Sequence, residues 1–223
     1  MVSAIAVVVF FFACGVTIIW ANGLKFNFST HSFETTALIS IESSLSNVNV
    51  YLNGELVGNE TPLQLRKLSA GYYTVKITSP GFYDFTKNFQ LASNGVGVVD
   101  NLVLIAQNPK ITTLDSSTAP SYVVYPTFDT GLSLSDGELF DGTKLITRFG
   151  QEPIQIHRFD TGYIYQVGKE IRLFLPTSNL DSLLYTAADT TPAKILVRPS
   201  NWIIYVYEGN SVKQIEIIKP SAG

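Results

Sequence analysis

Apolar and polar residues alternate along much of this chain with a period of two, which is the pattern of half-buried β-strands. Residues 37–41 and 47–52 show the alternation clearly, and Asn53-Gly54 follows the second stretch. Asn-Gly favours a two-residue hairpin turn, because both of its positions adopt positive φ angles. We therefore predict a β-hairpin whose return strand begins at Glu55.

Further turn signals divide the next stretch into short strands. Thr61-Pro62 favours an extended backbone, because proline fixes its own φ and biases the residue before it. Gly71 and Pro80-Gly81 mark two tight turns, and a last strand ends near Ile105. The strand between these two turns has three apolar residues on one face: Tyr73, Val75 and Ile77. About seven short strands at this spacing, without a helical period, predict a small β-sandwich.

Four short signatures occur in order within this stretch: Val50-Tyr51-Leu52-Asn53-Gly54, Gly58-Asn59-Glu60-Thr61-Pro62, Leu68-Ser69-Ala70-Gly71-Tyr72 and Gly81-Phe82-Tyr83. Their order and spacing over residues 36–106 resemble the PEGA domain, a bacterial and archaeal extracytoplasmic β-module. The tetrapeptide that names the family is changed here to Leu68-Ser69-Ala70-Gly71, which keeps the glycine. The resemblance implies a scaffold outside the cytoplasm, and each signature residue suits a turn or an inward-facing strand position.

A second β-rich part follows residues 107–122, which are rich in Thr, Ser and Pro and are typical of a linker or an extended edge segment. The sequence of this second part repeats. A shift of 39 residues places 145–149 on 184–188, Pro153 on Pro192, Ile156 on Ile195, and 163–166 on 202–205. After a two-residue insertion, Gly168 aligns with Gly209 and Ile171 with Val212.

A period near 40 residues with about four strands in each unit is typical of propeller blades. We therefore interpret residues 123–219 as an antiparallel β domain of two blade-like repeats, 145–174 and 184–218, with 133–145 as a leading strand. An ordinary antiparallel β domain with chance similarity is the alternative. Two blades cannot close a ring, so we expect the repeats to pack on another surface or to form a homo-oligomer.

Residues Val2 to Ala21 carry no charged side chain. Twenty helical residues rise about 30 Å, which is the thickness of the hydrocarbon core of a bilayer. We expect a transmembrane anchor over residues 1–23, because this run is longer than the apolar core of a typical signal peptide. Secretion after cleavage near Gly23 is the alternative. The fold class predicted for the whole chain is thus all-β behind one N-terminal transmembrane helix.

Few basic residues flank this segment, so charge bias does not decide its orientation. The PEGA-like module decides it, because such modules lie outside the cytoplasm. We therefore expect a single-pass protein of the bacterial cell membrane with the bulk of its chain extracytoplasmic.

Composition excludes several classes of site. The net charge is −3 and charged residues make up 15% of the chain, so we expect no basic surface for nucleic acid. Cys14 is the single cysteine, which excludes an intrachain disulfide and a cysteine-based zinc site. An imidazole metal site would need both His31 and His157. We therefore predict neither a metal nor a cofactor, and we expect His157 to be structural.

Some acidic residues are candidates for chemistry. Asp136, Glu138 and Asp141 suggest a calcium loop, but the alternating ligand run of such loops is missing and Asp-Gly is a common hairpin turn. Asp136 with Asp160 is the candidate carboxylate pair for a glycoside hydrolase, and turn positions explain most of these acids.

Four tyrosines are candidates for stacking on sugar rings: Tyr72, Tyr83, Tyr205 and Tyr207. Tyr72 is the best of them, because it points away from the inward-facing set on its strand. The alternative is that all four simply fill the sheets, in which aromatic residues are common.

No nucleophile elbow, metalloprotease helix or phosphate-binding loop occurs in the sequence, so we predict no catalytic residue. We expect a non-catalytic binding or scaffolding protein of the cell envelope, with an envelope protein or a polysaccharide as its partner. Carbohydrate binding through exposed aromatic residues is the main alternative. A carboxylate-based glycoside hydrolase is less favoured.

Overall fold

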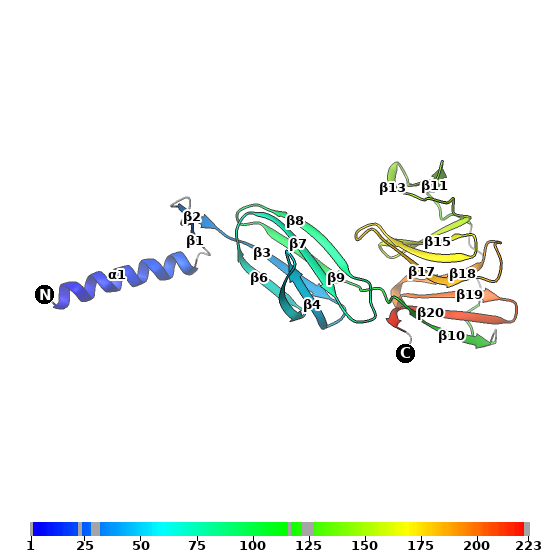
Figure 1. Cartoon of the computed structure of the whole chain (residues 1–223), viewed down its shortest axis with the longest axis horizontal. Coiled ribbons are helices and arrows are strands. Elements are labelled where there is room, and N and C mark those ends of the chain that lie inside the picture. The colour runs from blue at the N-terminus through cyan, green and yellow to red at the C-terminus, as the bar shows by residue number, and fades with distance from the viewer. Residues whose placement is uncertain (1, 22–23, 28–31, 116, 122–126, 221–223) are drawn as a thin grey trace. The chain divides into compact units, whose positions relative to one another are not determined.

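The computed structural model describes residues 2–21, 24–27, 32–115, 117–121 and 127–220, and side chains for residues 5–15, 17, 35–115, 117–121 and 127–219. Helix α1 (Val2–Ala21) begins the chain, and strands make up most of the rest (Figure 1). The chain divides into two compact units. The first comprises Met1–Ser79 and Asp84–Leu104, and the second comprises Pro80–Tyr83 and Ile105–Gly223.

Two sheets form the β-rich part of the first unit, besides the short hairpin of β1 (Leu24–Asn27) and β2 (Ser32–Thr35). One sheet has three strands in the order β6 (Leu63–Leu68), β3 (Ala37–Ser43) and β9 (Val96–Leu102). The other has four strands in the order β5 (Glu55–Glu60), β4 (Asn47–Leu52), β7 (Gly71–Thr78) and β8 (Phe85–Leu91). Strands β3 and β9 run parallel, and the other neighbours are antiparallel.

Alternate residues of both sheets form the core of this unit, as expected for stacked sheets. Ile39 of β3 and Val75 and Ile77 of β7 are fully buried. The two sheets approach closely at Gly97 of β9, where an added Cβ would lie 2.8 Å from the ring of Phe89 in β8.

The local turn and strand predictions for this unit are confirmed. Asn53 and Gly54 join β4 to β5 with φ angles of 51° and 87°, which is the positive-φ turn that the dipeptide favours. Val75 and Ile77 face inward, and Tyr72 faces outward with 77% of its surface exposed.

The described residues of the second unit form three sheets. The first has three strands, β11 (Leu132–Ser135), β12 (Glu138–Asp141) and β13 (Lys144–Arg148). The second has four, β14 (Gln155–Phe159), β15 (Gly162–Val167), β16 (Glu170–Leu175) and β17 (Leu180–Thr186). The third has the order β10 (Pro109–Asp115), β20 (Ser211–Pro220), β19 (Ile203–Glu208) and β18 (Lys194–Arg198), with a short 3-10 helix at Pro199–Asn201. All neighbouring strands are antiparallel.

The middle sheet of this unit is covered on both faces, as sheets with two apolar faces must be. On one face, Tyr163, Tyr165 and Phe174 form a hydrophobic cluster with Leu132 and Leu139 of the three-stranded sheet. On the other face, Phe159 meets Trp202, whose ring centroid lies 5.3 Å away at the start of β19. Figure 1 shows the middle sheet, in yellow, beside the orange strands β18 and β19.

Two buried glutamines join the middle sheet to the segment before β18. Gln155 Nε2 donates to Gln166 Oε1 at 2.6 Å and to the Ala193 carbonyl at 3.1 Å. Gln166 Nε2 donates to the Thr191 carbonyl, and its Oε1 accepts from the Ala193 amide. Because buried polar groups are costly unless paired, these bonds fix the segment 191–193 against β15.

The topology can be compared with three sequence-based expectations for the second part. Residues 109–115, expected as a linker or an extended edge segment, form edge strand β10 and so follow the second alternative, since Ile111 and two threonines favour extended backbone and Pro109 suits a strand's first position. Residues 133–145, expected as one leading strand, contain β11 and β12 and reach into β13. The expected start of the domain, residues 123–126, lies outside the described residues.

The 39-residue shift maps β14 onto β18 residue for residue, because 155–159 falls on 194–198. The predicted repeats nevertheless begin one strand too early. Repeat 145–174 begins in β13, which belongs to the three-stranded sheet, and repeat 184–218 begins inside β17, which belongs to the middle sheet. The sequence alignment therefore pairs an edge strand of the middle sheet with an edge strand of the third sheet, but its repeat boundaries do not coincide with the sheets.

Helix α1 coincides with the apolar run Val2–Ala21, and side chains are described for its residues 5–15 and 17. Within the part of the chain that the structure describes, no helix has the length and apolarity to cross a membrane. The candidate cleavage site near Gly23 and the histidine His31 lie outside the described residues.

Candidate functional site

The four candidate tyrosines do not form one site. Tyr72 belongs to the first unit, whereas Tyr83, Tyr205 and Tyr207 belong to the second and are each half-buried. Tyr207 donates its hydroxyl to the Pro120 carbonyl at 2.5 Å. Only Tyr72 therefore presents most of its ring to solvent.

The candidate acidic residues serve turns and ion pairs. Asp136 and Asp160 occupy separate hairpin turns, β11–β12 and β14–β15, with φ angles of 50° and 51°. Glu138 accepts a hydrogen bond from Arg148, and Asp141 accepts two from Arg158 and one from Tyr163. Among the described residues, no group of three or more His, Cys, Asp or Glu side chains gathers as metal ligands.

His157 is buried in β14 and has hydrogen-bonding neighbours on both ring nitrogens. Nδ1 lies 3.2 Å from Asp129 Oδ1, and Nε2 lies 3.3 Å from Gln155 Oε1. The Asp129 carboxylate also accepts from the Arg158 amide at 2.7 Å. This network holds residues 127–129 along the edge of β14, where Phe128 bridges Ile156, and it supports the structural role expected for this histidine.

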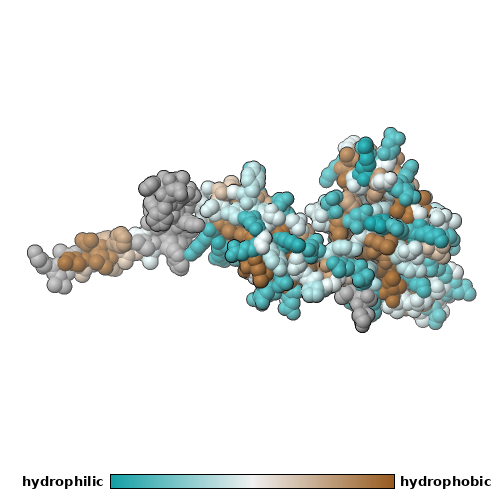
Figure 2. Space-filling model, in the orientation of Figure 1, coloured by the Kyte–Doolittle hydropathy of each residue, from teal (hydrophilic) through white to brown (hydrophobic). Residues whose placement is uncertain are grey.

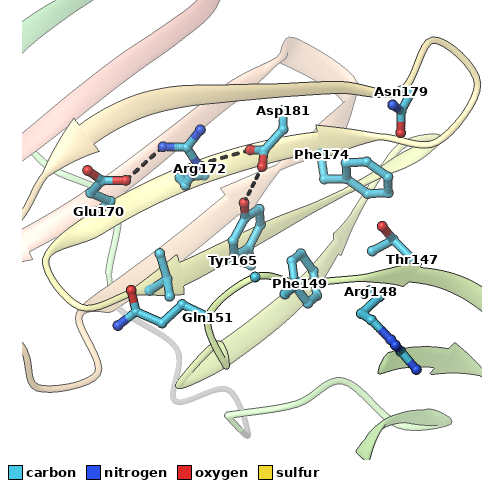
Figure 3. Close-up of a pocket in the computed structure, with 12 residues that line it drawn as sticks. Thr147, Arg148, Phe149, Gln151, Tyr165, Glu170, Arg172, Phe174, Asn179 and Asp181 are labelled. Atoms are coloured by element: carbon cyan, nitrogen blue, oxygen red, sulfur yellow. Dashed lines mark hydrogen bonds and ion pairs between the residues drawn. The ribbon is translucent and has the colours of Figure 1, made fainter. Parts of the chain in front are cut away.

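A cleft of about 370 Å³ opens in the second unit, on the face of the middle sheet that meets the three-stranded sheet. One side is formed by Thr147–Gln151, at the end of β13 and in the loop that follows. The other side is formed by strands β15 to β17 and the β16–β17 turn, with Tyr165, Glu170, Arg172, Phe174, Asn179 and Asp181. Figure 3 shows Phe149 beside Tyr165, and Arg172 between Glu170 and Asp181.

Strand alternation places the polar side chains of the cleft on one face of the sheet. Tyr165 pairs with Arg172 across β15 and β16, and Phe174 pairs with Asp181 across β16 and β17. A register shift between Ile171 and Arg172 lets Leu183 take the place opposite Arg172. Asp181 lies two pairs further along, opposite Phe174, and bonds to both Arg172 and Tyr165.

Aromatic rings form the apolar part of the cleft. The ring centroid of Phe149 lies 4.6 Å from that of Tyr165. It lies 6.4 Å from that of Phe174, in an edge-to-face arrangement. Tyr165 and Phe174 are almost fully buried, whereas Phe149 is half-buried. Phe149 thus packs the loop after β13 onto the sheet and still presents apolar surface to the cleft.

Arg172 lies between two carboxylates. Its Nη1 donates to Glu170 at 2.7 Å and its Nε donates to Asp181 at 2.9 Å, as Figure 3 shows. Tyr165 donates its hydroxyl to the other oxygen of Asp181 at 2.7 Å. Burial raises the pKa of the Tyr165 hydroxyl, and the bond to Asp181 raises it further. Burial lowers the pKa of the Arg172 guanidinium, but Asp181 and Glu170 outweigh it and the net shift is upward.

Sequence reasoning missed this cleft, although one signal was present. Arg172 and Asp181 stand at alternating positions within the largely apolar strands 170–175 and 180–186. A charged residue at the inward phase of a strand usually has a partner, since unpaired buried charges are costly. The other side of the cleft, Thr147–Gln151, carried no comparable sequence signal.

The PEGA domain family matches residues 36–100 of the chain. These residues include strands β3 to β8 and most of β9 in the first unit. No curated protein and no solved structure matches the chain. The PEGA match therefore covers the β-rich part of the first unit, and the cleft lies in the second unit, outside it.

Proposed function

We propose that this chain is a non-catalytic binding protein of the cell envelope, in which the cleft of the middle sheet holds the ligand. The observation that carries the proposal is the paired charge of the cleft. Arg172 bonds to Glu170 and Asp181, and Arg148 at the rim bonds to Glu138. Such a site offers fixed donors and acceptors beside an apolar surface, as binding sites for small molecules do.

Catalysis is less well supported by the same contacts. A glycosidase needs one carboxyl group that delivers a proton and a second that acts as base or nucleophile. Asp181 and Glu170 are instead both acceptors to a single guanidinium, and Asp181 accepts from Tyr165 as well. The pair Asp136 and Asp160 occupies separate turns.

Anchoring by α1 is part of the proposal. The support for it comes from the sequence, in which twenty residues from Val2 to Ala21 carry no charged side chain. Large apolar side chains of this helix are exposed, with Phe12 at 75% and Val8 and Phe11 at 69% (Figure 2). Such an apolar surface on a helix is unfavourable in water and favourable in lipid.

The PEGA match supports placement of the chain outside the cytoplasm. We interpret the first unit as a scaffold, because its signature residues serve turns and core positions. We interpret the sheets of the second unit as blade-like repeats, with β10 as the fourth strand of the last one. Homo-oligomerisation of these repeats stays a prediction.

Photo-crosslinking in intact cells tests the function. A photoreactive residue is introduced at Gln151 on the exposed rim of the cleft and, as a matched control, at Gln90 on the exposed face of β8. We expect adducts from position 151 in the full-length chain and none from position 90. Adducts at neither position, or equal adducts at both, would contradict a binding cleft.

The placement is tested separately by protease treatment. An externally added protease should degrade both β-rich units in intact cells whose outer envelope has been made permeable. Degradation that occurs only after lysis of the inner membrane would contradict the extracytoplasmic placement.

A further inference from the structure

We infer that the ligand of this cleft is a neutral saccharide, held by Arg172, Asp181, Glu170 and Gln151 against the ring of Phe149. The inference rests on the proposed binding function and gives its ligand a chemical class. It also assigns sugar recognition to the cleft, and not to the four tyrosines that the sequence suggested.

The charges of the cleft argue against an ionic ligand. Arg172 and Arg148 contribute two positive charges, and Asp181 and Glu170 contribute two negative charges. Each arginine already bonds to a carboxylate. Arg172 pairs with Glu170 and Asp181, and Arg148 pairs with Glu138. An anionic ligand would lie beside the carboxylates of Glu170 and Asp181, and a cationic ligand beside the guanidinium groups of Arg172 and Arg148, so either would meet charge of its own sign. A neutral ligand keeps every pair intact.

The remaining hydrogen-bonding capacity suits hydroxyl groups. Arg172 uses its Nε and Nη1 in the two bonds to its carboxylates, and a guanidinium has five N–H donors in all. The Glu170 carboxylate, 46% exposed, keeps lone pairs for a ligand. The amides of Gln151 and Asn179 both donate and accept. Vicinal hydroxyl groups are the ligand groups that donate to carboxylates and accept from guanidinium and amide groups at the same time.

The apolar part of the cleft has the complementary property. A sugar ring has polar edges and an apolar C–H face, and the half-buried ring of Phe149 offers a surface on which that face can pack. The volume of about 370 Å³ lies near the lower end of small-molecule sites, about 300–1,000 Å³. The cleft therefore suits the end of a saccharide chain or a short stretch of it.

The test uses full-length protein in detergent micelles with ¹⁵N-labelled arginine, so that the Arg172 Nε–H signal reports on the cleft and the Arg66 signal on the first unit. The neutral probes are cellohexaose, mannohexaose and fully N-acetylated chitohexaose. Polygalacturonate and a short unstructured peptide serve as an anionic and a non-saccharide probe. We expect at least one neutral probe to shift the Arg172 signal and leave the Arg66 signal unchanged.

Variants connect this shift to the cleft. Gln151→Ala removes one exposed amide and should weaken binding by about fivefold, the value of one ordinary hydrogen bond. Gln90→Ala, which removes an exposed amide in the first unit, should leave the affinity unchanged. Tyr72→Ala should also leave it unchanged. Saccharide binding that depends on Tyr72 and is insensitive to Gln151→Ala would overturn the assignment to the cleft.

The outcomes separate the ligand class from the binding function. If only the peptide or polygalacturonate shifts Arg172, the saccharide inference fails and the binding cleft stands. If crosslinks form at position 151 in cells and every neutral probe fails at millimolar concentration, the saccharide inference fails alone. If position 151 gives no crosslink and no probe shifts Arg172, both fail.

Discussion

Replacing Gly162 with alanine is expected to destabilise the second unit, because a side chain there would strike the backbone of the neighbouring strand. Gly162 is the first residue of β15, and an added Cβ would lie 2.5 Å from the Phe174 carbonyl oxygen and 2.5 Å from Leu175 Cδ2. Close carbon–oxygen contacts in sheets are about 3.3 Å, so the overlap with the oxygen is about 0.8 Å. Leu175 can change its rotamer, whereas the carbonyl belongs to β16, which pairs with β15.

The magnitude follows from two opposing effects. Overpacking of this kind costs about 1–3 kcal/mol, and we take the upper end because the obstacle is backbone. Alanine also reduces the conformational entropy of the unfolded chain, which stabilises the folded protein by about 0.4–1 kcal/mol. The free energy of unfolding should therefore fall by about 2 kcal/mol. Gly150→Ala is the matched control, because nothing lies within 4 Å of a Cβ built there and its φ is not positive.

Urea unfolding followed by tryptophan fluorescence measures this difference. Trp202 packs against Phe159 and reports on the second unit, and Trp20→Phe removes the other tryptophan of the chain. Gly162→Ala should lower the urea midpoint, and Gly150→Ala should leave it unchanged or raise it. Equal midpoints for the two variants would refute the reasoning from the Phe174 carbonyl.

Three further predictions follow from single contacts. Ser182→Ala should raise the free energy of unfolding by about 1 kcal/mol, because the buried Ser182 hydroxyl has no hydrogen-bond partner among the described residues; the exposed Ser133→Ala is the control, and a loss of stability in Ser182→Ala would show an unseen partner. Glu216→Gln should cost stability at neutral pH, because Lys219 and then Lys110 outweigh burial and lower the pKa of Glu216 from its ordinary value of 4.5. That contribution is present above pH 4.5 and is lost as pH falls through the lowered pKa, so the free energies of unfolding of the wild type and Glu216→Gln should converge in acid. A constant difference between them down to pH 3 would contradict this reasoning. Gly97→Ala should destabilise the first unit by about 1–3 kcal/mol, because its Cβ would lie 2.8 Å from the Phe89 ring; amide exchange in β8 and β9 should accelerate while the Trp202 transition stays unchanged, and unaltered exchange would count against the contact.

Local chemistry made the first unit predictable. The turn at Asn53-Gly54 and the alternation along β7 depend on residues that are neighbours in sequence, and both are confirmed. The parallel pairing of β3 with β9 was not predicted. It joins strands more than fifty residues apart in sequence, and nothing in either strand specifies the partner.

The second unit was less predictable because its pairings are less local. The fourth strand of its last sheet is β10, which binds β20 about a hundred residues later, as the bond from Lys213 to Thr113 illustrates. No repeat alignment could place β10 there, because it precedes the repeats. The cleft was missed for a related reason, since its two sides come from different sheets.

The same face of the middle sheet and of the last sheet has different neighbours, which accounts for the cleft on the middle sheet. The 39-residue shift places Tyr165 on Ile204, and the later two-residue insertion places Phe174 on Ile215. Ile204 and Ile215 are fully buried on the face that carries Trp202, which meets the middle sheet at Phe159. Tyr165 and Phe174 instead face a sheet of only three strands. A three-stranded sheet covers less of a four-stranded one, and Arg172 and Asp181 occupy the part that stays open. This face is therefore buried core in the last sheet, whereas in the middle sheet part of it stays open as the cleft.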